Sequence, residues 1–280
     1  MAKILSGKEV ASAIAANTRR EADAMKDSGH PPLLRIIRVG EKKSDLAYEM
    51  GIRKRAEACG VDLSVDVLPE DVSETDIKNA IGKANLDDTV HGILLFLPLP
   101  RHLNEKEIIN CIAPEKDLDG ATDISMLGVY KGTNEGFAPC TPEAVVRILD
   151  YYGIDLSGKD VVIVGRSLVV GKPLAQMLMA RNATVTTCHT KTKDLPEKTK
   201  RADILISAAG HIGTIKAEHV REGQIVIDVG INFDESGKMT GDVDFEDVSN
   251  IVSAITPVPG GVGSVTNAVL LAHICEGRVQ

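Results

Sequence analysis

The first half of the chain alternates short apolar runs with longer amphipathic stretches. Residues 33–39 (LLRIIRV), 62–68 (DLSVDVL) and 92–97 (GILLFL) are rich in aliphatic and β-branched side chains and have the length of strands. The stretches near 44–59 and 73–85, which lie between them, carry apolar residues at helical spacing. Strands that alternate with helices are typical of a parallel sheet with crossover helices, so this half predicts one α/β unit.

A second series of apolar runs follows a region from Pro114 to Pro142, whose prolines and glycines interrupt the periodicity as a linker or a cleft wall would. The final segment, from about 266 to 277, has helical period, and we expect it to pack back on the first domain. The whole pattern predicts an α/β fold with two domains. The strands expected in the second series are 160–164, 183–188, 203–208, 224–229 and 251–255.

Composition narrows the class of protein. A length of 280 residues lies near the upper size of a single hydrophobic core, which favours two moderate domains. Forty Asp and Glu against 32 Lys and Arg give a net charge of −8, which disfavours binding to nucleic acid or to a membrane surface. The sequence has no apolar stretch near the length of a membrane span and no apolar signal core at its start, so we expect a cytoplasmic protein.

Cysteine and histidine spacing gives no sign of a metal. The five cysteines are scattered and form no C-x-x-C pair, which fits reduced thiols better than disulfides or zinc. The seven histidines show neither H-x-x-x-H nor H-E-x-x-H spacing. We therefore predict no structural or catalytic metal.

One glycine loop has the surroundings of a nucleotide site. The segment V-V-I-V-G-R-S-L-V-V-G-K-P leads from an expected strand into an amphipathic helix that should end near Asn182, an order that suits a pyrophosphate at a helix start. Gly165 and Gly171 stand one residue too far apart for the ATP-binding loop, and Pro173 occupies the place of its magnesium-binding hydroxyl. G-x-G-x-x-G is also missing. ATP hydrolysis is disfavoured, and a dinucleotide site and an ordinary turn stay equal alternatives.

The next expected strand bears on the choice of dinucleotide. It ends in His189, Thr190 and Lys191, without the carboxylate that takes the ribose 2′-hydroxyl in a typical NAD site. Hydroxyls and cations suit a 2′-phosphate, and Arg166 could add a planar fork to the same group. The sequence favours NADP over NAD, with a solvated surface turn as the alternative.

Eight stretches follow one another along essentially the whole chain: Y-E-M-G-I-R-K-R, L-F-L-P-L-P, P-E-K-D-L-D-G, P-C-T-P, V-G-R-S-x-x-V-G-K-P, D-V-G-I-N, G-D-V-D-F and T-P-V-P-G-G-V-G. Together and in this order they resemble the methylenetetrahydrofolate dehydrogenase/cyclohydrolase (FolD-type) family. The resemblance implies an N-terminal α/β folate domain (1–138), a C-terminal Rossmann-like NADP-binding domain (139–265) and a C-terminal helix (266–280) that returns to the first. It also implies a homodimer whose substrate is a one-carbon derivative of tetrahydrofolate.

The resemblance implies roles for individual residues. Tyr48 corresponds to the tyrosine that lines the pterin site, and Asp119 to the carboxylate that holds the pterin amino group and ring N–H. On the residues alone, a core aromatic and a turn acid are the simpler interpretations. The positions that match substrate contacts are Tyr48, Leu95, Leu97, Asp119, Pro259, Gly260, Gly261 and Gly263, and those that match NADP contacts are Gly165, Arg166, Ser167, Gly171, Thr190 and Ile231.

Two departures concern the hydrolytic half of the family's chemistry. The lysine four residues after the tyrosine is replaced by Ile52, and the glutamine before L-P-L-P by Phe96. Neither side chain can donate a hydrogen bond or help to activate water. Hydride removal needs orientation over the nicotinamide but no proton transfer from the protein. With Tyr48 and Asp119 retained as catalytic positions, we predict a methylenetetrahydrofolate dehydrogenase with weak or absent cyclohydrolase activity.

Three alternatives stay open. Arg55 returns to nearly the same helix face as Tyr48 and could replace the lost lysine, although arginine is a poor acid–base group; the enzyme would then be fully bifunctional. A non-catalytic folate- or dinucleotide-binding protein is a second alternative. NAD as the cofactor is the third, since monofunctional members of the family can use it.

Overall fold

The computed structural model describes residues 1–133 and 135–276, and the chain divides into two compact units. The N-terminal unit consists of residues 13–140 together with the chain from 267 onward, and the C-terminal unit of residues 1–12 and 141–266. The first domain was expected to begin at residue 1. Instead β1 (Lys3–Ile4) pairs with β11 (Ala254–Ile255), and this pairing places the first residues in the C-terminal unit.

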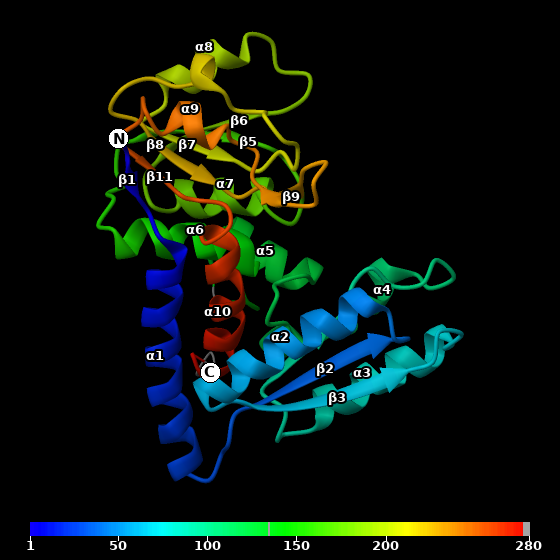
Figure 1. The fold of residues 1–280 in the computed structure, drawn as a ribbon. Helices are drawn as coiled ribbons and strands as arrows, with labels where there is room; N and C mark the ends of the chain where they lie inside the picture. Colours follow the sequence, from blue (N-terminus) through cyan, green and yellow to red (C-terminus); the bar gives the residue numbers. More distant parts are fainter. Residues whose placement is uncertain (134, 277–280) are drawn as a thin grey trace. The chain divides into compact units, whose positions relative to one another are not determined.

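The N-terminal unit is built on a three-stranded parallel sheet in the order β3-β2-β4, of which Figure 1 labels β2 and β3. Strands β2 (Leu33–Val39) and β3 (Asp62–Leu68) have the predicted bounds. Strand β4 (Gly92–Leu95) ends two residues earlier than expected, shortly before the cis peptide bond between Leu97 and Pro98.

Helices α2 (Lys43–Cys59) and α3 (Glu74–Leu86) follow β2 and β3, as the periodicity predicts. Successive side chains of a strand point to opposite faces of its sheet, and Ile37 of β2 shares a core cluster with Ile77 of α3. Helix α2 is tied to β2 by a buried ion pair, because Arg38 Nε lies 2.8 Å from Glu49 Oε2.

The region from 114 to 142 is more regular than the predicted linker. It contains the 3-10 turn η1 (Pro114–Lys116) and helix α5 (Asp123–Lys131), which follow helix α4 (Glu105–Ile109). Thr122 caps α5, since its hydroxyl accepts the backbone N–H of Ser125 at 3.1 Å. Buried Asp117 accepts from the backbone N–H of Thr122 at 2.8 Å and from the hydroxyl of Ser125 at 2.7 Å. Capping and a buried carboxylate therefore order a stretch that lacks helical periodicity.

The C-terminal unit contains a six-stranded parallel sheet in the order β1-β11-β8-β7-β5-β6 (Figure 1). Chain order reverses at β5, which has β6 on one side and β7 on the other, so a crevice for ligands is expected outside the carboxyl ends of β5 and β7. The predicted strand 251–255 is shorter than expected. The strands β5–β8 are β5 (Asp160–Val164), β6 (Thr184–Cys188), β7 (Ile204–Ser207) and β8 (Ile225–Asp228).

Helices and turns surround this sheet. The final helix, α10 (Val262–Cys275), begins four residues before its predicted start, and α1 (Gly7–Asp27) and α10 both contribute residues to the two units. Among the described residues, none of the helices combines the length and apolar character needed to cross a bilayer. The remaining elements are α6 (Cys140–Tyr151), α7 (Gly171–Met179), α8 (Leu195–Arg201), η2 (Ala217–His219), β9 (Asn232–Phe233), β10 (Met239–Thr240) and α9 (Phe245–Val248).

Candidate active site

Tyr48 lies on the exposed side of α2 and rests on an aromatic neighbour. Its ring centroid is 5.3 Å from that of Phe96, with 44° between the ring planes, and its hydroxyl donates to Asn267 Oδ1 at 3.3 Å. The Tyr48 residue is 44% exposed, whereas Phe96, on which its ring packs, is 7% exposed. Of the flanking candidates, Leu97 is exposed and Leu95 is buried in the core of the unit.

The charge state of Tyr48 suits a hydrogen-bond donor. Desolvation by the surrounding protein raises the pKa of Tyr48 to about 12, and the nearby charges of Asp119 and Cys140 raise it further, while Arg55 opposes them. The phenol therefore stays neutral at physiological pH. It can donate a hydrogen bond to a ligand but does not act as a base there.

Ile52 is 1% exposed and belongs to the buried side of α2. The cation that acts on Tyr48 from the same helix is Arg55, as the helical spacing predicts. Arg55 folds back along α2, and its Nη1 donates to the backbone oxygen of Gly51 at 3.0 Å.

Asp119 belongs to the D-L-D-G stretch, and its residue is exposed to solvent. Desolvation raises the pKa of this carboxyl and the charge of Asp117 adds to the rise, whereas a hydrogen bond from Cys140 and the charge of His273 lower it. Asp119 thus reaches the surface of the unit, while the protein around its carboxyl and a hydrogen bond from Cys140 constrain that group. A carboxylate there can accept two N–H groups from a planar ligand edge.

A buried group supports the backbone next to Asp119. His273 of α10 is 2% exposed, stacks on Phe137 with ring centroids 4.7 Å apart, and its Nδ1 donates to the backbone oxygen of Leu118 at 2.7 Å. The thiol of Cys140 donates to the same oxygen at 3.2 Å. Because Nδ1 is committed to a carbonyl, we interpret the pair as structural support and not as a thiol nucleophile with its base.

The glycine loop of the C-terminal unit leaves room only for hydrogen at two positions. Gly165 has a φ of 138°, and a Cβ there would come within 2.2 Å of the backbone oxygen of Ala208. A Cβ on Gly171, the first residue of α7, would come within 2.2 Å of the Gly165 oxygen. Close backbone packing at the carboxyl end of β5 fits the approach of a dinucleotide pyrophosphate.

The polar candidates for the cofactor lie on the surface around this loop. Ser167 Oγ accepts the backbone N–H of Val170 at 3.1 Å, so this hydroxyl shapes the loop. Arg166 and Thr190 are exposed, so a phosphate group could reach both side chains from the solvent. Helix α7 ends at Met179, three residues before the predicted Asn182, which adopts a left-handed conformation with a φ of 64°.

The turn 259–263 packs closely against the N-terminal end of α1. A Cβ on Gly7 would lie 1.9 Å from the Gly261 oxygen, and a Cβ on Gly261 would lie 2.3 Å from the Pro257 oxygen. Gly263 faces Ile231, whose Cδ1 would be 3.3 Å from a Cβ at Gly263. Ile231 is 56% exposed. The structure thus brings together one substrate candidate and one cofactor candidate within the C-terminal unit.

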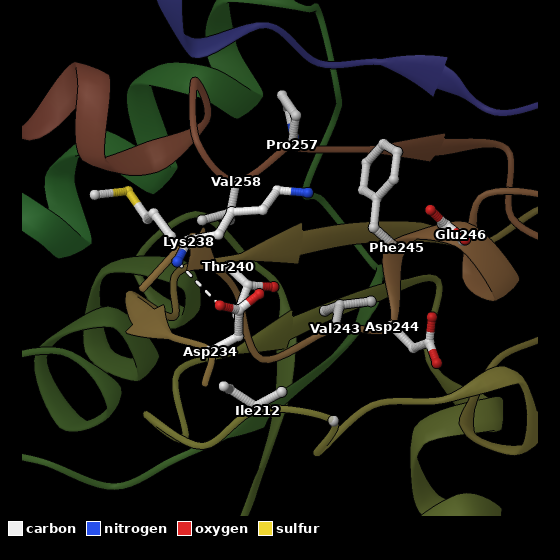
Figure 2. A pocket seen from close by; sticks show the side chains of 12 residues that line it. Ile212, Asp234, Lys238, Thr240, Val243, Asp244, Phe245, Glu246, Pro257 and Val258 are labelled. Carbon is white, nitrogen blue, oxygen red and sulfur yellow. Dashed lines mark hydrogen bonds between the residues drawn. The ribbon is translucent and has the colours of Figure 1, made fainter. Parts of the chain in front are cut away.

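A separate cavity of about 410 Å³ lies among segments that follow β7, β8 and β11 (Figure 2). Its walls include Ile212, Phe245 and Val258, and the backbone N–H of Lys238 donates to Asp234 Oδ1 at 2.9 Å at its edge. None of the candidate residues predicted from the sequence lines this cavity, so the cavity does not contribute to the assignment.

Comparison with known families now decides the identity of these units. Residues 5–119 match the family described as tetrahydrofolate dehydrogenase/cyclohydrolase, catalytic domain, and residues 139–279 match its NAD(P)-binding domain. The chain belongs to the tetrahydrofolate dehydrogenase/cyclohydrolase family. Its fold is accordingly an N-terminal catalytic folate domain followed by a C-terminal NAD(P)-binding domain with a parallel sheet, which confirms the predicted fold class.

Individual family members are similar over nearly the full chain. The "Bifunctional protein FolD" of Clostridium botulinum (strain Langeland) is 49% identical over 276 residues, which cover 99% of this chain and 98% of the relative. The crystal structure of the Campylobacter jejuni bifunctional enzyme FolD has a TM-score of 0.96 at 42% identity, with 99% and 98% of the two chains covered. The Trypanosoma brucei enzyme, solved with NADP and an inhibitor, has a TM-score of 0.89 at 34% identity, with 98% and 96% covered.

Sequence reasoning missed several residues that contact or support the candidate residues in the structure. Asn267 has no motif of its own and comes to Tyr48 only through the fold. Cys140 lies inside the P-C-T-P stretch, but its contact with the Leu118 carbonyl depends on tertiary structure. Asp242, from G-D-V-D-F, is fully buried and accepts hydrogen bonds from the loop after β7, which the motif alone did not predict.

Proposed function

We propose that the protein oxidises 5,10-methylenetetrahydrofolate to 5,10-methenyltetrahydrofolate with NADP and has weak or absent cyclohydrolase activity. The observation that carries the second part is the buried, apolar nature of Ile52, which follows Tyr48 by four residues on α2, and of Phe96, whose ring lies against that of Tyr48. Neither side chain can orient or deprotonate water, and general acid–base help of that kind contributes roughly 10²–10⁴-fold in rate.

In the proposed reaction, the residues of the N-terminal unit orient the substrate. Asp119 accepts the amino and ring N–H groups of the pterin, and the neutral phenol of Tyr48 donates a hydrogen bond while its ring lines the pterin face. Leu97 adds an exposed apolar contact, with Leu95 behind it. In the C-terminal unit, the glycine-rich turn with Pro259, Gly260, Gly261 and Gly263 supplies backbone that a flat ring can approach.

The residues of the C-terminal unit hold the cofactor in this proposal. Gly165, Ser167 and Gly171 form the close-packed loop for the pyrophosphate, and Ile231 gives an exposed apolar contact. Arg166 and Thr190 take the 2′-phosphate and make NADP the preferred cofactor, with NAD as the alternative. When bound, NADP accepts the hydride that leaves the methylene carbon, and the adjacent nitrogen lone pair stabilises the cation that remains.

A fully bifunctional enzyme is the second candidate. Two observations favour it: Arg55 acts electrostatically on Tyr48, and the curated relatives carry the name "Bifunctional protein FolD". Arginine stays protonated at physiological pH, so Arg55 could stabilise negative charge but could not accept a proton from water.

The decisive test measures both reactions on one preparation. Dehydrogenation is followed by reduced-cofactor absorbance, and hydrolysis by loss of added methenyl-folate after correction for the uncatalysed rate. We expect clear dehydrogenation and hydrolysis at least about 100-fold slower. Comparable rates would establish the bifunctional enzyme, and if Arg55→Ala then lost only hydrolysis, Arg55 would be the replacement group. Absence of dehydrogenation with both cofactors would instead indicate a binding protein.

The proposal includes a homodimer, which the resemblance implies. Light scattering during size-exclusion chromatography should give twice the chain mass of 29.9 kDa. A mass equal to one chain across the assay concentrations would contradict it.

A further inference from the structure

Two motifs of the C-terminal unit, D-V-G-I-N and G-D-V-D-F, pack closely against each other at the carboxyl end of β8. Each contributes one buried aspartate, Asp228 or Asp242, and one glycine, Gly230 or Gly241. A Cβ on Gly230 would lie 2.2 Å from Asp242 Oδ1, and a Cβ on Gly241 would lie 1.9 Å from Asp228 Oδ2. Each glycine therefore makes room for the carboxylate of the other motif. We call these four residues the Asp–Gly lock.

Asp242 accepts hydrogen bonds from two separate segments, 207–211 and Asn232. Its Oδ2 accepts the hydroxyl of Ser207 at 3.0 Å and the backbone N–H groups of Ala209 and Gly210 at 2.7 and 3.1 Å. Its Oδ1 accepts the backbone N–H of His211 at 2.9 Å and the Nδ2 of Asn232 at 3.0 Å. One fully buried carboxylate thus fixes the loop 208–211 and the segment after Ile231 at the same time.

Asp228 completes the arrangement from the end of β8. Its Oδ1 accepts the backbone N–H groups of Gly230 and Asp242, both at 3.0 Å, and its Oδ2 accepts that of Val243 at 3.0 Å. These bonds close the turn that carries Ile231 and hold the Asp242 backbone in place. Within the part of the chain that the structure describes, the donors to both carboxylates are backbone, hydroxyl and amide groups, and none is a charged side chain.

The lock lies at the edge of the sheet where a dinucleotide is expected. The loop 208–211 follows the carboxyl end of β7, next to β5, and the Ala208 oxygen presses against Gly165 of the glycine loop. Displacement of the loop 208–211 would therefore move the Ala208 backbone that packs against Gly165. Movement of Asn232 would shift Ile231, the exposed apolar candidate for a cofactor contact.

We propose that Asp242, held by Asp228, is a positioning residue for the dinucleotide: it keeps the loops after β7 and β8 in the conformation that receives the cofactor. The proposal rests on the proposed function, because it concerns the same cofactor site. A carboxylate is required since only it offers two acceptor oxygens to donors on both sides. In an asparagine at position 242, the side-chain NH2 group would replace one acceptor oxygen and would face N–H or O–H donors with which it cannot form a hydrogen bond.

The test compares Asp242→Asn with Gln224→Ala. Gln224 is also 0% exposed, and its Nε2 donates to the Thr199 and Ala202 oxygens, at 2.6 and 2.9 Å, before the amino end of β8. Both variants should melt at a lower temperature than wild type. Calorimetric titration with NADP should show a Kd at least about tenfold higher for Asp242→Asn only. KM for NADP should rise likewise, with kcat at saturating NADP changed less than about threefold.

Amide hydrogen exchange on the cofactor-free protein gives an independent measurement. The N–H groups of residues 209–211 should exchange faster in Asp242→Asn and keep wild-type protection in Gln224→Ala. If Asp242→Asn does not fold, Ser207→Ala removes one donor to the carboxylate and should raise the Kd for NADP by a smaller factor.

Two outcomes overturn the proposal and are distinguishable from each other. If Asp242→Asn or Ser207→Ala binds NADP as tightly as wild type while losing stability as Gln224→Ala does, Asp242 is only structural. If wild type itself binds neither NADP nor NAD, the proposed function fails, whatever the exchange of residues 209–211 shows.

Discussion

The two units hold their candidate residues by different means. In the N-terminal unit the chemistry lies in side chains: Tyr48 rests on the buried ring of Phe96, and Asp119 offers a carboxyl beside it. In the C-terminal unit it lies in the backbone, where Gly165 and the loop 208–211 are fixed by the buried carboxylate of Asp242. The N-terminal site should therefore respond to changes in packing and side-chain polarity. The C-terminal site should respond to loss of hydrogen-bond acceptors and to added Cβ atoms.

The largest loss of stability is expected from a charge placed on the buried side of α2. Ile52→Lys should lower the free energy of unfolding by about 3–5 kcal/mol, because a residue that is 1% exposed would carry an unpaired ammonium group. It should not create cyclohydrolase activity while Phe96 is present. Ile52→Val, which removes one methyl group, is the matched control and should cost about 1 kcal/mol. Equal denaturation midpoints for Ile52→Lys and wild type would show that this side of α2 is not packed.

The stability of the C-terminal unit should depend on pH through the buried carboxyl of Asp228. Burial raises the pKa of Asp228 from 3.8 to about 6, with the charge of Asp242 adding to the rise, although three backbone N–H groups oppose it. Protonation then favours the folded state. This contribution is fully present below the unfolded pKa and is lost as the pH rises through about 6, so it should remove about 2–3 kcal/mol between pH 4 and 7.

Urea unfolding as a function of pH measures this contribution. The difference in unfolding free energy between wild type and Asp228→Asn should fall over that range. Asp247→Asn, at an exposed position of α9, should follow wild type throughout. A difference curve that stays flat for Asp228→Asn would mean that its hydrogen bonds outweigh its burial.

Asp119→Asn should weaken substrate recognition and leave the cofactor site intact. An amide offers one acceptor where the carboxylate offers two, so kcat/KM for the folate substrate should fall about 10- to 100-fold. The Kd for NADP should stay within about twofold. Glu115→Gln, an exposed acid in the turn before it, is the control and should change neither quantity. A parallel loss of NADP binding in Asp119→Asn would contradict the division of labour between the units.

The smallest effect concerns the choice between the two dinucleotides. Arg166→Ala should lower kcat/KM with NADP about tenfold and leave the value with NAD nearly unchanged, because only NADP carries the 2′-phosphate. Lys159→Ala removes an exposed cation next to the amino end of β5 and should alter neither value. An equal loss with both cofactors would remove Arg166 from the phosphate contact.

The accuracy of the sequence predictions differs between elements for physical reasons. Strands β2, β3 and β5 have the predicted bounds because their sequences carry a local signal: β2 and β5 are mostly apolar, and β3 alternates apolar and polar residues. Helix α5 was missed because it depends on the Thr122 cap and on buried Asp117, contacts that hydrophobic periodicity does not record. Strand β1 was missed because two residues acquire strand character only by pairing with β11.

The sequence by itself determined the alternation of strands and helices, the glycine loop after β5, and the absence of a polar group at positions 52 and 96. These features depend on the order and chemistry of neighbouring residues. Only the tertiary structure decided that Asn267 meets Tyr48, that residues 1–12 join the C-terminal unit, and that Asp242 holds the loop after β7. Such contacts join residues far apart in the chain, so no local pattern records them, and buried polar groups such as Asp242 find their partners only when the chain folds.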